Sequence, residues 1–284
     1  MIRKLLPVLL VLAVGLTACG FHVSIPITTI RPGPLVTDQI NIPQPDSVNS
    51  VALSLAFGAG TLKVHSGASA LVSGTATYNI ADFKPIVTLN GSNVRIEQGN
   101  WHLNGIPNFS NIKNTWDLSL GKQPLDLSIE AGAYQAEYQF GGLALSNLTV
   151  KDGASDAKMN FASPNLTEMS LLSYETGASN VSLTGLGNAN FASLLFHSGA
   201  GNFTLDFTGN LKRSGSVNVE TGVSNTTLVI PSGIPVQLTV NSGLSNVTYD
   251  SDWSKNGNLY TQTGNGPQLT IVVRIGAGNL TLTR

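Results

Sequence analysis

The stretch SGAGNFTLDF, residues 198–207, is one copy of a phrase that recurs along this chain. The chain ends on a close copy, GAGNLTL at residues 276–282. The other copies are GASNVSL at Gly177, GVSNTTL at Gly222 and GLSNVTY at Gly243, with weaker versions at Gly58, Gly67, Gly132 and Gly153. Between Gly132 and Gly243 the copies begin 21, 24, 22, 23 and 21 residues apart, which is typical of a stacked-repeat architecture. The 65 residues from Gly67 to Gly132 are predicted to contain degenerate coils of the same period.

Apolar residues fall in fixed columns when the first Gly of each copy is numbered zero. In the copy at Gly199, Leu194 and Phe196 occupy positions −5 and −3, and Phe203 and Leu205 occupy +4 and +6. Alternation with polar residues predicts strands with one buried face. The apolar positions change from odd to even offsets, so we expect the backbone to bend between +1 and +4. Position +1 is mostly Ala, with Val223 and Leu244 as larger exceptions, and is expected to face inward.

The residues at the expected bend are small or turn-forming. Position +2 is Gly or Ser in most copies, and position +3 is Asn in the best copies. Asn tolerates the left-handed conformation, and stacked Asn side chains can hydrogen-bond along a ladder. The ladder would contain Asn180, Asn202, Asn225, Asn246 and Asn279. The sequence therefore predicts an all-β fold, a β-solenoid of stacked coils of about 22 residues or a closely related stacked meander. It leaves open whether neighbouring strands run parallel or antiparallel.

The N-terminus has the features of a lipoprotein signal peptide. Arg3 and Lys4 precede an apolar run, and small residues precede Cys19, the only cysteine, as in a bacterial lipobox. We expect a signal peptide over residues 1–18, lipid on Cys19, and a Pro-rich tether through residue 47. The remaining chain is divided into a β domain over 48–162 and repeats over 163–284, expected to be continuous. This predicts an extracytoplasmic protein attached to a membrane by lipid.

Composition excludes several classes of function. Removing Arg3 and Lys4 leaves 13 basic and 16 acidic residues and a net charge of −3, which argues against nucleic-acid binding. One cysteine cannot form an intrachain disulfide, and the four His residues lack metal-site spacing. No nucleophile-elbow or phosphate-binding motif occurs. The sequence therefore predicts no catalytic residues, no metal and no cofactor.

One polar column, at position −2, is expected to face outward. Its members include Glu130, Lys151, Glu175, His197 and Glu220. They could line a groove for a ligand or cation, but a solvated face that avoids stacking like charges is the favoured interpretation. Asp250 and Asp252 are the close acidic pair of the repeats and could hold a sugar or Ca²⁺ beside Trp253, although a surface loop is favoured. Trp101 and Trp116 are interpreted as packing residues.

Residues 74–132 carry a different phrase, and it resembles a known family. The matching features are Tyr78-Asn79, Pro85, the Val94–Gly99 strand, Trp116-x-Leu118, Pro124-Leu125-x-Leu127 and Gly132-Ala133. They resemble the toast-rack domains of bacterial envelope proteins, related to the LiaF-like family. The resemblance covers most of residues 48–284 and implies an extracytoplasmic β-solenoid with roles in envelope-stress sensing or adhesion.

Two functional hypotheses follow. The first is a non-enzymatic, lipid-anchored scaffold, adhesion or envelope-stress interaction module, whose partner is an envelope protein or a cell-wall polysaccharide. The second is a polysaccharide-active β-helix enzyme or a carbohydrate-binding protein of the cell envelope. The enzyme would need clustered carboxylates on one face.

Overall fold

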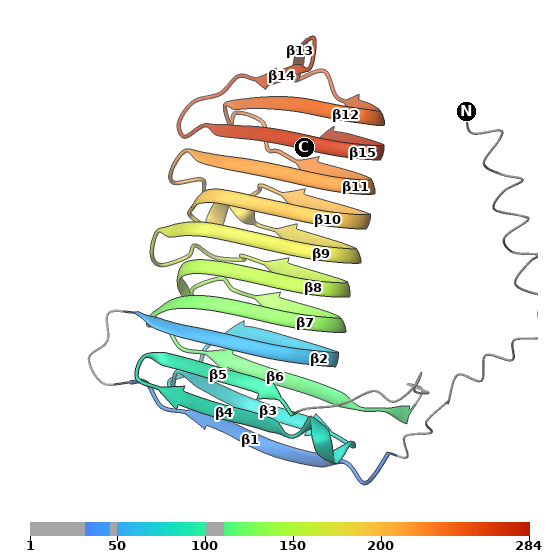
Figure 1. Ribbon diagram of the computed structural model, residues 1–284. Helices are drawn as coiled ribbons and strands as arrows, with labels where there is room; N and C mark the ends of the chain where they lie inside the picture. Colours follow the sequence, from blue (N-terminus) through green and yellow to red (C-terminus); the bar gives the residue numbers. More distant parts are fainter. Residues whose placement is uncertain (1–31, 46–49, 100–110) are drawn as a thin grey trace, which may run out of the picture. The chain divides into compact units, whose positions relative to one another are not determined.

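The computed structural model describes residues 32–45, 50–99 and 111–284. Gly33–Asn100 and Ile112–Arg284 belong to one compact unit, which is nearly all β (Figure 1). Its strands belong to one 15-stranded sheet. They are β1 (Val36–Ile42), β2 (Val51–Ser66), β3 (Val72–Tyr78), β4 (Pro85–Asn90), β5 (Asn93–Gln98), β6 (Asn114–Leu120), β7 (Pro124–Gln139), β8 (Ala144–Asn160), β9 (Met169–Thr184), β10 (Phe191–Asp206), β11 (Gly215–Val229), β12 (Val236–Tyr249), β13 (Ser254–Asn256), β14 (Leu259–Gln262) and β15 (Leu269–Thr283). Two 3-10 helices are also described, η2 (Ala81–Phe83) and η4 (Leu186–Asn188).

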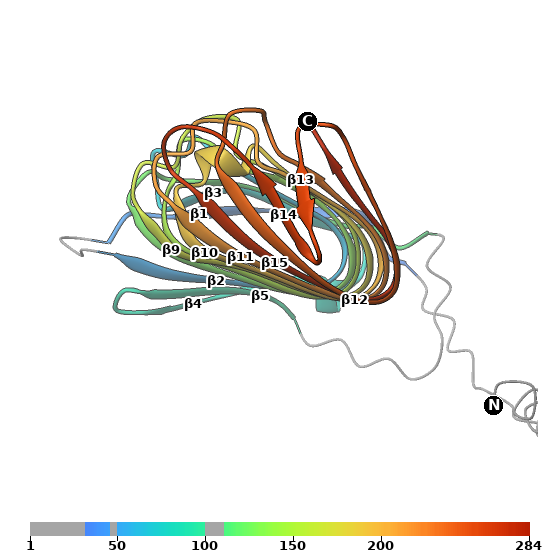
Figure 2. The same cartoon turned by 90° about the horizontal axis from the view of Figure 1, so that it is seen from above.

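The long strands stack in parallel and confirm the predicted solenoid. Their order in the sheet is β2, β7, β8, β9, β10, β11, β15 and β12. Equivalent positions of the repeat face one another, as in the alignment of Asn202 with Asn180 on one side and Asn225 on the other. Seen along the stack, each strand runs through a common bend and doubles back (Figure 2). The two halves of each strand therefore form two layers, with the core between them.

The bend lies at a different position from the one the columns predicted. In β10, Leu194 and Phe196 are buried before the bend, and Phe203 and Leu205 are buried after it. Gly199 and Ala200 are both exposed. Two consecutive residues at positions 0 and +1 therefore face outward, and positions −1 and +2 face inward on either side of them. The expectation that +1 faces inward was wrong, and the large side chains at this position lie in solvent: Val223 is 63% and Leu244 84% exposed.

The recurring Gly at position 0 is explained by the close stacking of the bends. A Cβ on Gly222 would lie 2.5 Å from the carbonyl oxygen of Gly199 in the neighbouring coil. A Cβ on Gly276 would lie 2.6 Å from the carbonyl oxygen of Gly222. Ordinary side chains do not approach a carbonyl oxygen this closely, so most coils need a residue without Cβ at this position.

The last strand of the chain is not the last strand of the stack. β15 inserts between β11 and β12 and is in parallel register with both. β12 is therefore the outermost long strand, and its first half pairs on the far side with β14 of the β13–β14 hairpin. Trp253 and Tyr260, from the segment between β12 and β15, are 6% and 2% exposed and pack on the core. The segment covers this end of the stack, as Figure 1 shows at the top.

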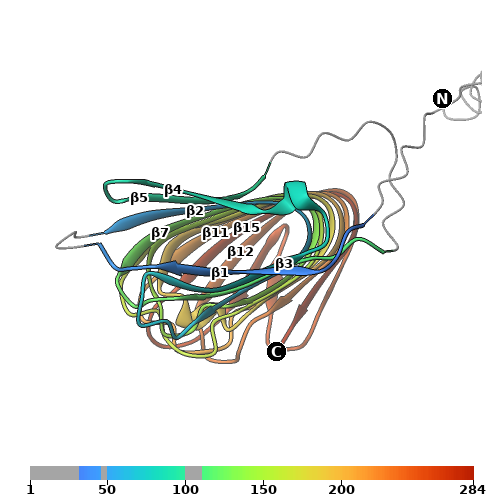
Figure 3. The ribbon, with the colours of Figure 1, turned by 90° about the horizontal axis from the view of Figure 1, so that it is seen from below.

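The other end of the stack is made by shorter strands. β5 pairs with the first half of β2, and β6 pairs with the second half, so these two strands together form one coil that is split at its bend. This split coil accounts for part of the long gap between repeat copies. β3 and β1 extend the β6 side, and β4 extends the β5 side, all antiparallel (Figure 3). Gly67 follows the end of β2 and is not a bend of the repeat.

Part of the expected Pro-rich tether is folded. Residues 36–42 form β1, which pairs with β3 along its whole length. Ile40 and Ile42 alternate with exposed residues and are each 5% exposed, so this short segment buries one face like the other strands. The signal peptide at residues 1–18, Cys19 and Trp101 lie outside the described residues. The sheet is continuous across residue 162, because β8 and β9 pair up to Asn160 and Thr184.

Aromatic side chains fill the core between the two layers. In β10, Phe196 from before the bend meets Phe203 from after it, edge to face, with ring centroids 5.0 Å apart. Tyr174 of the neighbouring coil stacks on Phe196 at 5.8 Å. Trp116 is completely buried and contacts Phe57 edge to face, so it is a packing residue. No helix in the described part of the chain is long and apolar enough to cross a membrane.

Candidate functional site

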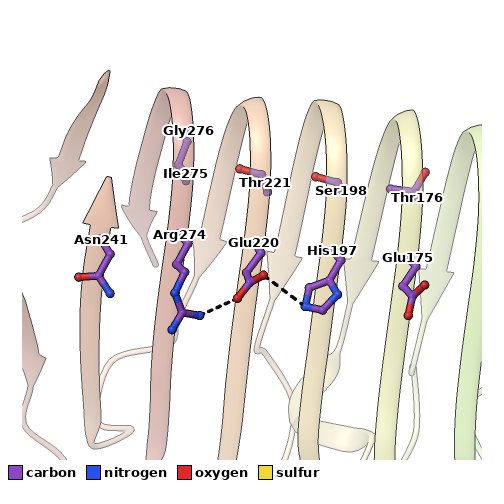
Figure 4. Close-up of a pocket in the computed structure, with 10 residues that line it drawn as sticks. All are labelled: Glu175, Thr176, His197, Ser198, Glu220, Thr221, Asn241, Arg274, Ile275 and Gly276. Carbon is purple, nitrogen blue, oxygen red and sulfur yellow. Dashed lines mark hydrogen bonds and ion pairs between the residues drawn. The ribbon is translucent and has the colours of Figure 1, made fainter. Parts of the chain in front are cut away.

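The polar column at position −2 forms a continuous row along the outer face of the first strand halves. Each member is in register with the same position of the next coil. We call it the charged row. In stack order it contains Glu130, Lys151, Glu175, His197, Glu220, Arg274 and Asn241. Figure 4 shows its second half, from Glu175 to Asn241, with side chains on the same face of successive strands.

Opposite charges alternate in the charged row and pair along it. Lys151 Nζ lies 3.5 Å from Glu175 Oε2. Arg274 Nη1 lies 2.6 Å from Glu220 Oε1, and His197 Nε2 lies 3.8 Å from Glu220 Oε2. These side chains are each more than 40% exposed, so the pairs contribute little stability individually. Their main effect is to hold an ordered sequence of charges on a rigid sheet.

Glu220 is the most heavily contacted acid of the row. Asn218 Nδ2 donates a hydrogen bond of 3.1 Å to Glu220 Oε1, and the Arg274 guanidinium donates to the same oxygen. The hydrogen bond from Asn218 holds the pKa of Glu220 below its usual value, and the positive charges of Arg274 and His197 act in the same direction. Glu220 therefore stays ionised to a lower pH than an isolated glutamate side chain. Sequence order alone would have placed Asn241 beside Glu220, so Arg274 was missed as its partner.

A surface groove with a volume of about 760 Å³ follows this part of the row. Its wall contains Glu175, His197, Glu220, Arg274 and Asn241, together with Thr176, Ser198 and Thr221 at position −1. The Ser198 hydroxyl is buried and makes no hydrogen bond to another described residue. The groove thus offers alternating charges spaced by the strand separation of about 4.8 Å, whereas the hydroxyls at position −1 face inward.

The asparagines at position +3 form a second row, after the bend. Nδ2 of Asn202 donates to Oδ1 of Asn180 at 2.9 Å, Asn225 donates to Asn202 at 3.0 Å, and Asn279 donates to Asn225 at 2.7 Å. Asn246 stacks in register on Asn279 at the end of the row. These residues lie inside the strands. Among described non-glycine residues only Asn190 has a positive φ, of 56°, so the expected left-handed conformation of the row was wrong.

An inward-facing acid was missed by the sequence analysis. Asp152 occupies position −1, where neighbouring coils have Thr176 and Ser198. Its carboxylate accepts hydrogen bonds from the hydroxyls of Tyr174 at 2.8 Å and Tyr134 at 3.2 Å, and from Thr176. Burial and then nearby groups, including the Asp152 charge, raise the pKa of both tyrosines, which stay protonated. The sequence did contain a signal for this residue, because Asp152 is an acid at position −1, where the alternation pattern predicts an inward-facing side chain.

Both acids of the Asp250–Trp253 loop form ion pairs with Arg284. Arg284 forms ion pairs with Asp250, at 3.5 Å from Nε to Oδ2, and with Asp252. Ser232 Oγ also donates to Asp252 at 3.2 Å. These contacts tie the end of β15 to the loop that covers β12. Within the described ranges, no three His, Cys, Asp or Glu side chains gather where they could hold a metal ion.

The stacked parallel coils, each made from one strand with a central bend, define a β-solenoid with ordered polar rows on its outer faces. Within this class, the chain belongs to the toast_rack family. Residues 31–171 and 165–229 match the family model described as the N-terminal domain of toast_rack, DUF2154. The resemblance found in residues 74–132 is therefore confirmed. No significant match was found among curated proteins.

Several solved structures are similar to the chain. One, provisionally described as a cell adhesion protein from Clostridium sporogenes, is 19% identical with a TM-score of 0.47, covering 88% of this chain and 99% of its own. Another, provisionally described as an adhesin from Bacteroides fragilis, is 15% identical with a TM-score of 0.48, covering 89% and 99%. A third, provisionally described as a lipid-binding protein from Parabacteroides distasonis, is 11% identical with a TM-score of 0.42, covering 89% and 99%.

Proposed function

We propose that this chain is a non-enzymatic interaction module of the bacterial cell envelope, of the adhesion type, attached to a membrane by lipid on Cys19. The observation that carries the proposal is the charged row with its groove, an exposed and ordered set of charges on a rigid solenoid. Such a surface can recognise an extended partner, either an envelope protein or a cell-wall polysaccharide, through repeated contacts. A more specific version of this proposal is that the charged row takes part in sensing envelope stress.

The distribution of acids supports an interaction role over a hydrolytic one. In the charged row Glu175 and Glu220 are separated by His197 and each lies beside a base. Asp250 and Asp252 are both paired with Arg284. Glycoside hydrolysis needs one carboxyl group kept protonated and a second one free to act as nucleophile or base. Each of these acids is already engaged in an ion pair, an arrangement that suits binding.

The interaction is tested with the purified full chain and isolated envelopes. Removing three charges of the row with Lys151→Gln, Glu175→Gln and Glu220→Gln should weaken binding to envelopes and reduce its dependence on salt. The matched control neutralises Lys63 and Glu137, an exposed ion pair of 3.2 Å after the bend. Equal binding by the row variant and the unchanged protein would refute the charged row as the interaction surface. Release of reducing ends from envelope polysaccharide would refute the non-enzymatic assignment.

The anchor is tested separately by fractionation of cells. Cys19→Ser should leave an unacylated precursor that is not processed as the unchanged protein is and does not partition with membranes. If the variant is processed and partitions like the unchanged protein, lipid on Cys19 is not the anchor.

A further inference from the structure

We propose that the outer face after the bend binds an uncharged, extended polysaccharide along two rows of amides and hydroxyls. The inference rests on the proposed interaction function and assigns it a class of ligand. It uses the second halves of the strands, whereas the charged row lies on the first halves. The rows, which we call the amide–hydroxyl array, consist of Asn180 and Ser182, Asn202 and Thr204, Asn225 and Thr227, Asn279 and Thr281, and Asn246 and Thr248.

The geometry of the amide–hydroxyl array is set by the backbone. Register pairing puts Thr204 between Ser182 and Thr227, and Thr281 between Thr227 and Thr248. The hydroxyls therefore repeat across the strands at about 4.8 Å, and each amide lies about 6.6 Å along the strand from its hydroxyl. A ligand with a short, regular repeat could make the same contact at every coil.

The array is ordered before any ligand arrives. Each amide from Asn202 onward to Asn279 donates in the same direction along the row, to the coil before it in the stack. This chain of hydrogen bonds fixes the planes of the amides and leaves each with a second N–H. The hydroxyls of Thr204, Thr227 and Thr281 make no hydrogen bond to another described residue. Preorganised groups with unused donors and acceptors lose little entropy when a ligand binds.

A separate observation is that the surface is hollowed over part of these rows, from β9 to β11. A groove of about 460 Å³ crosses β8 to β11, and its wall includes Asn180, Ser182, Asn202, Thr204, Asn225 and Thr227. Asp156 and Lys158 of β8 line its other end, so the uncharged part of the rows begins at β9. The groove runs across the strands, in the direction in which the array repeats.

The chemistry of the array favours a neutral sugar polymer. Amides and hydroxyls both donate and accept, which matches the hydroxyl groups of sugars. The array carries no cation, so it offers nothing to the phosphates of a nucleic acid, whose binding depends on Lys and Arg. Individually weak hydrogen bonds add up when a polymer spans several coils. We therefore expect binding to long chains and little binding to single sugars.

The test measures binding of the purified full chain to insoluble cellulose and chitin. The array variant combines Thr204→Val, Thr227→Val and Thr281→Val, which removes three hydroxyls and keeps β-branched side chains of the same shape. The control combines Thr149→Val, Thr239→Val and Thr270→Val, from the first halves of the strands. We expect the unchanged protein to bind one or both polymers in high salt, and the array variant to bind about tenfold more weakly, from the loss of three modest hydrogen bonds. The control should bind normally.

Each other outcome is decisive. No binding to either polymer overturns the inference, and so does equal loss in the array variant and the control, provided that all proteins melt at the same temperature. Binding that disappears in high salt assigns the interaction to charges and also overturns it. Envelope binding through the charged row is measured independently, so failure of this inference is distinguished from failure of the proposed function.

Discussion

The side-chain amide of Asn279 donates a 2.7 Å hydrogen bond to Asn225, across a sequence separation of 54 residues. The same position of the intervening repeat, Asn246, lies beyond Asn279 in the stack. This pairing places β15 between β11 and β12, two strands that follow each other directly among the long strands of the sequence. Closure of the stack therefore depends on the last residues of the chain.

Removing residues 269–284 should open the stack at β11. β12 has no other long neighbour, so its amides should lose protection from hydrogen exchange together with those of β11. Amides of β7 to β9 should stay protected, because each repeat of a solenoid depends mainly on its neighbours. Hydrogen exchange read by mass spectrometry checks this. Retained protection of β12 would mean that it can pair directly with β11.

Replacing the glycines at position 0 by alanine should cost more stability where the neighbouring coil leaves less space for the Cβ. Gly222→Ala puts a Cβ 2.5 Å from a carbonyl oxygen, and we expect a loss of about 1–3 kcal/mol, as for other overpacked sites. Gly153→Ala, in the same column with a contact of 3.1 Å, is the matched control and should cost less. Urea unfolding measures both. A larger loss for Gly153→Ala would contradict the stacking argument.

Asn225 should prefer a β-branched replacement to glycine. Its backbone is extended and it lies within β11, so Val fits the strand, whereas Gly adds about 0.5–1 kcal/mol of conformational cost. Both variants lose the hydrogen bonds to Asn202 and Asn279, each worth about 0.5–1.5 kcal/mol. Thermal melting should therefore rank Asn225→Val above Asn225→Gly. A higher melting temperature for Asn225→Gly than for Asn225→Val would instead support a left-handed backbone conformation at Asn225.

Asp152 should stabilise the fold by accepting hydrogen bonds from buried hydroxyl groups. Asp152→Leu leaves the Tyr174 hydroxyl without its carboxylate acceptor and removes one of the partners of Tyr134 and Thr176, which keep Tyr138 and Ser179. We expect a loss of about 1–3 kcal/mol, the cost of leaving one buried group unsatisfied. The control is Asp156→Leu, an exposed acid on the same strand, which should change stability by about 0.5 kcal/mol or less. Similar losses in both variants would show that the inward hydrogen bonds contribute little.

Pairing of β1 with β3 should weaken in alkali. Burial, with the hydrogen bond of 2.7 Å to Asp38 and its charge, raises the pKa of Tyr78 from 10.0 to about 12. A raised pKa means that the folded state favours the protonated phenol. This contribution is complete below pH 10.0, the unfolded value, and is lost as the pH rises through about 12. Tyr78→Phe should therefore show a smaller fall in urea stability over this range. Parallel pH profiles for Tyr78→Phe and the unchanged protein would argue against a stabilising contribution from the protonated Tyr78 phenol.

The sequence predicted the features that depend on local alternation and on repetition. Leu194, Phe196, Phe203 and Leu205 were assigned to the core because a strand alternates its faces, and they are buried. The period of the repeats predicted stacked coils, and equal offsets predicted which asparagines and which charged residues would share a row. The exact place of the bend was missed, because a column of Ala at +1 fits an inward or an outward position equally well by composition.

Tertiary structure decided the order of the coils, and with it the partners within each row. Every coil presents nearly the same edge, so the sequence contains no signal that β15 belongs beside β11 and not beyond β12. That choice puts Arg274 next to Glu220 and Asn279 next to Asn225. It also leaves Arg284 beside Asp250 and Asp252. Local alternation is a property of neighbouring residues, whereas the order of similar edges depends on the free energy of the whole stack and on how its ends are covered.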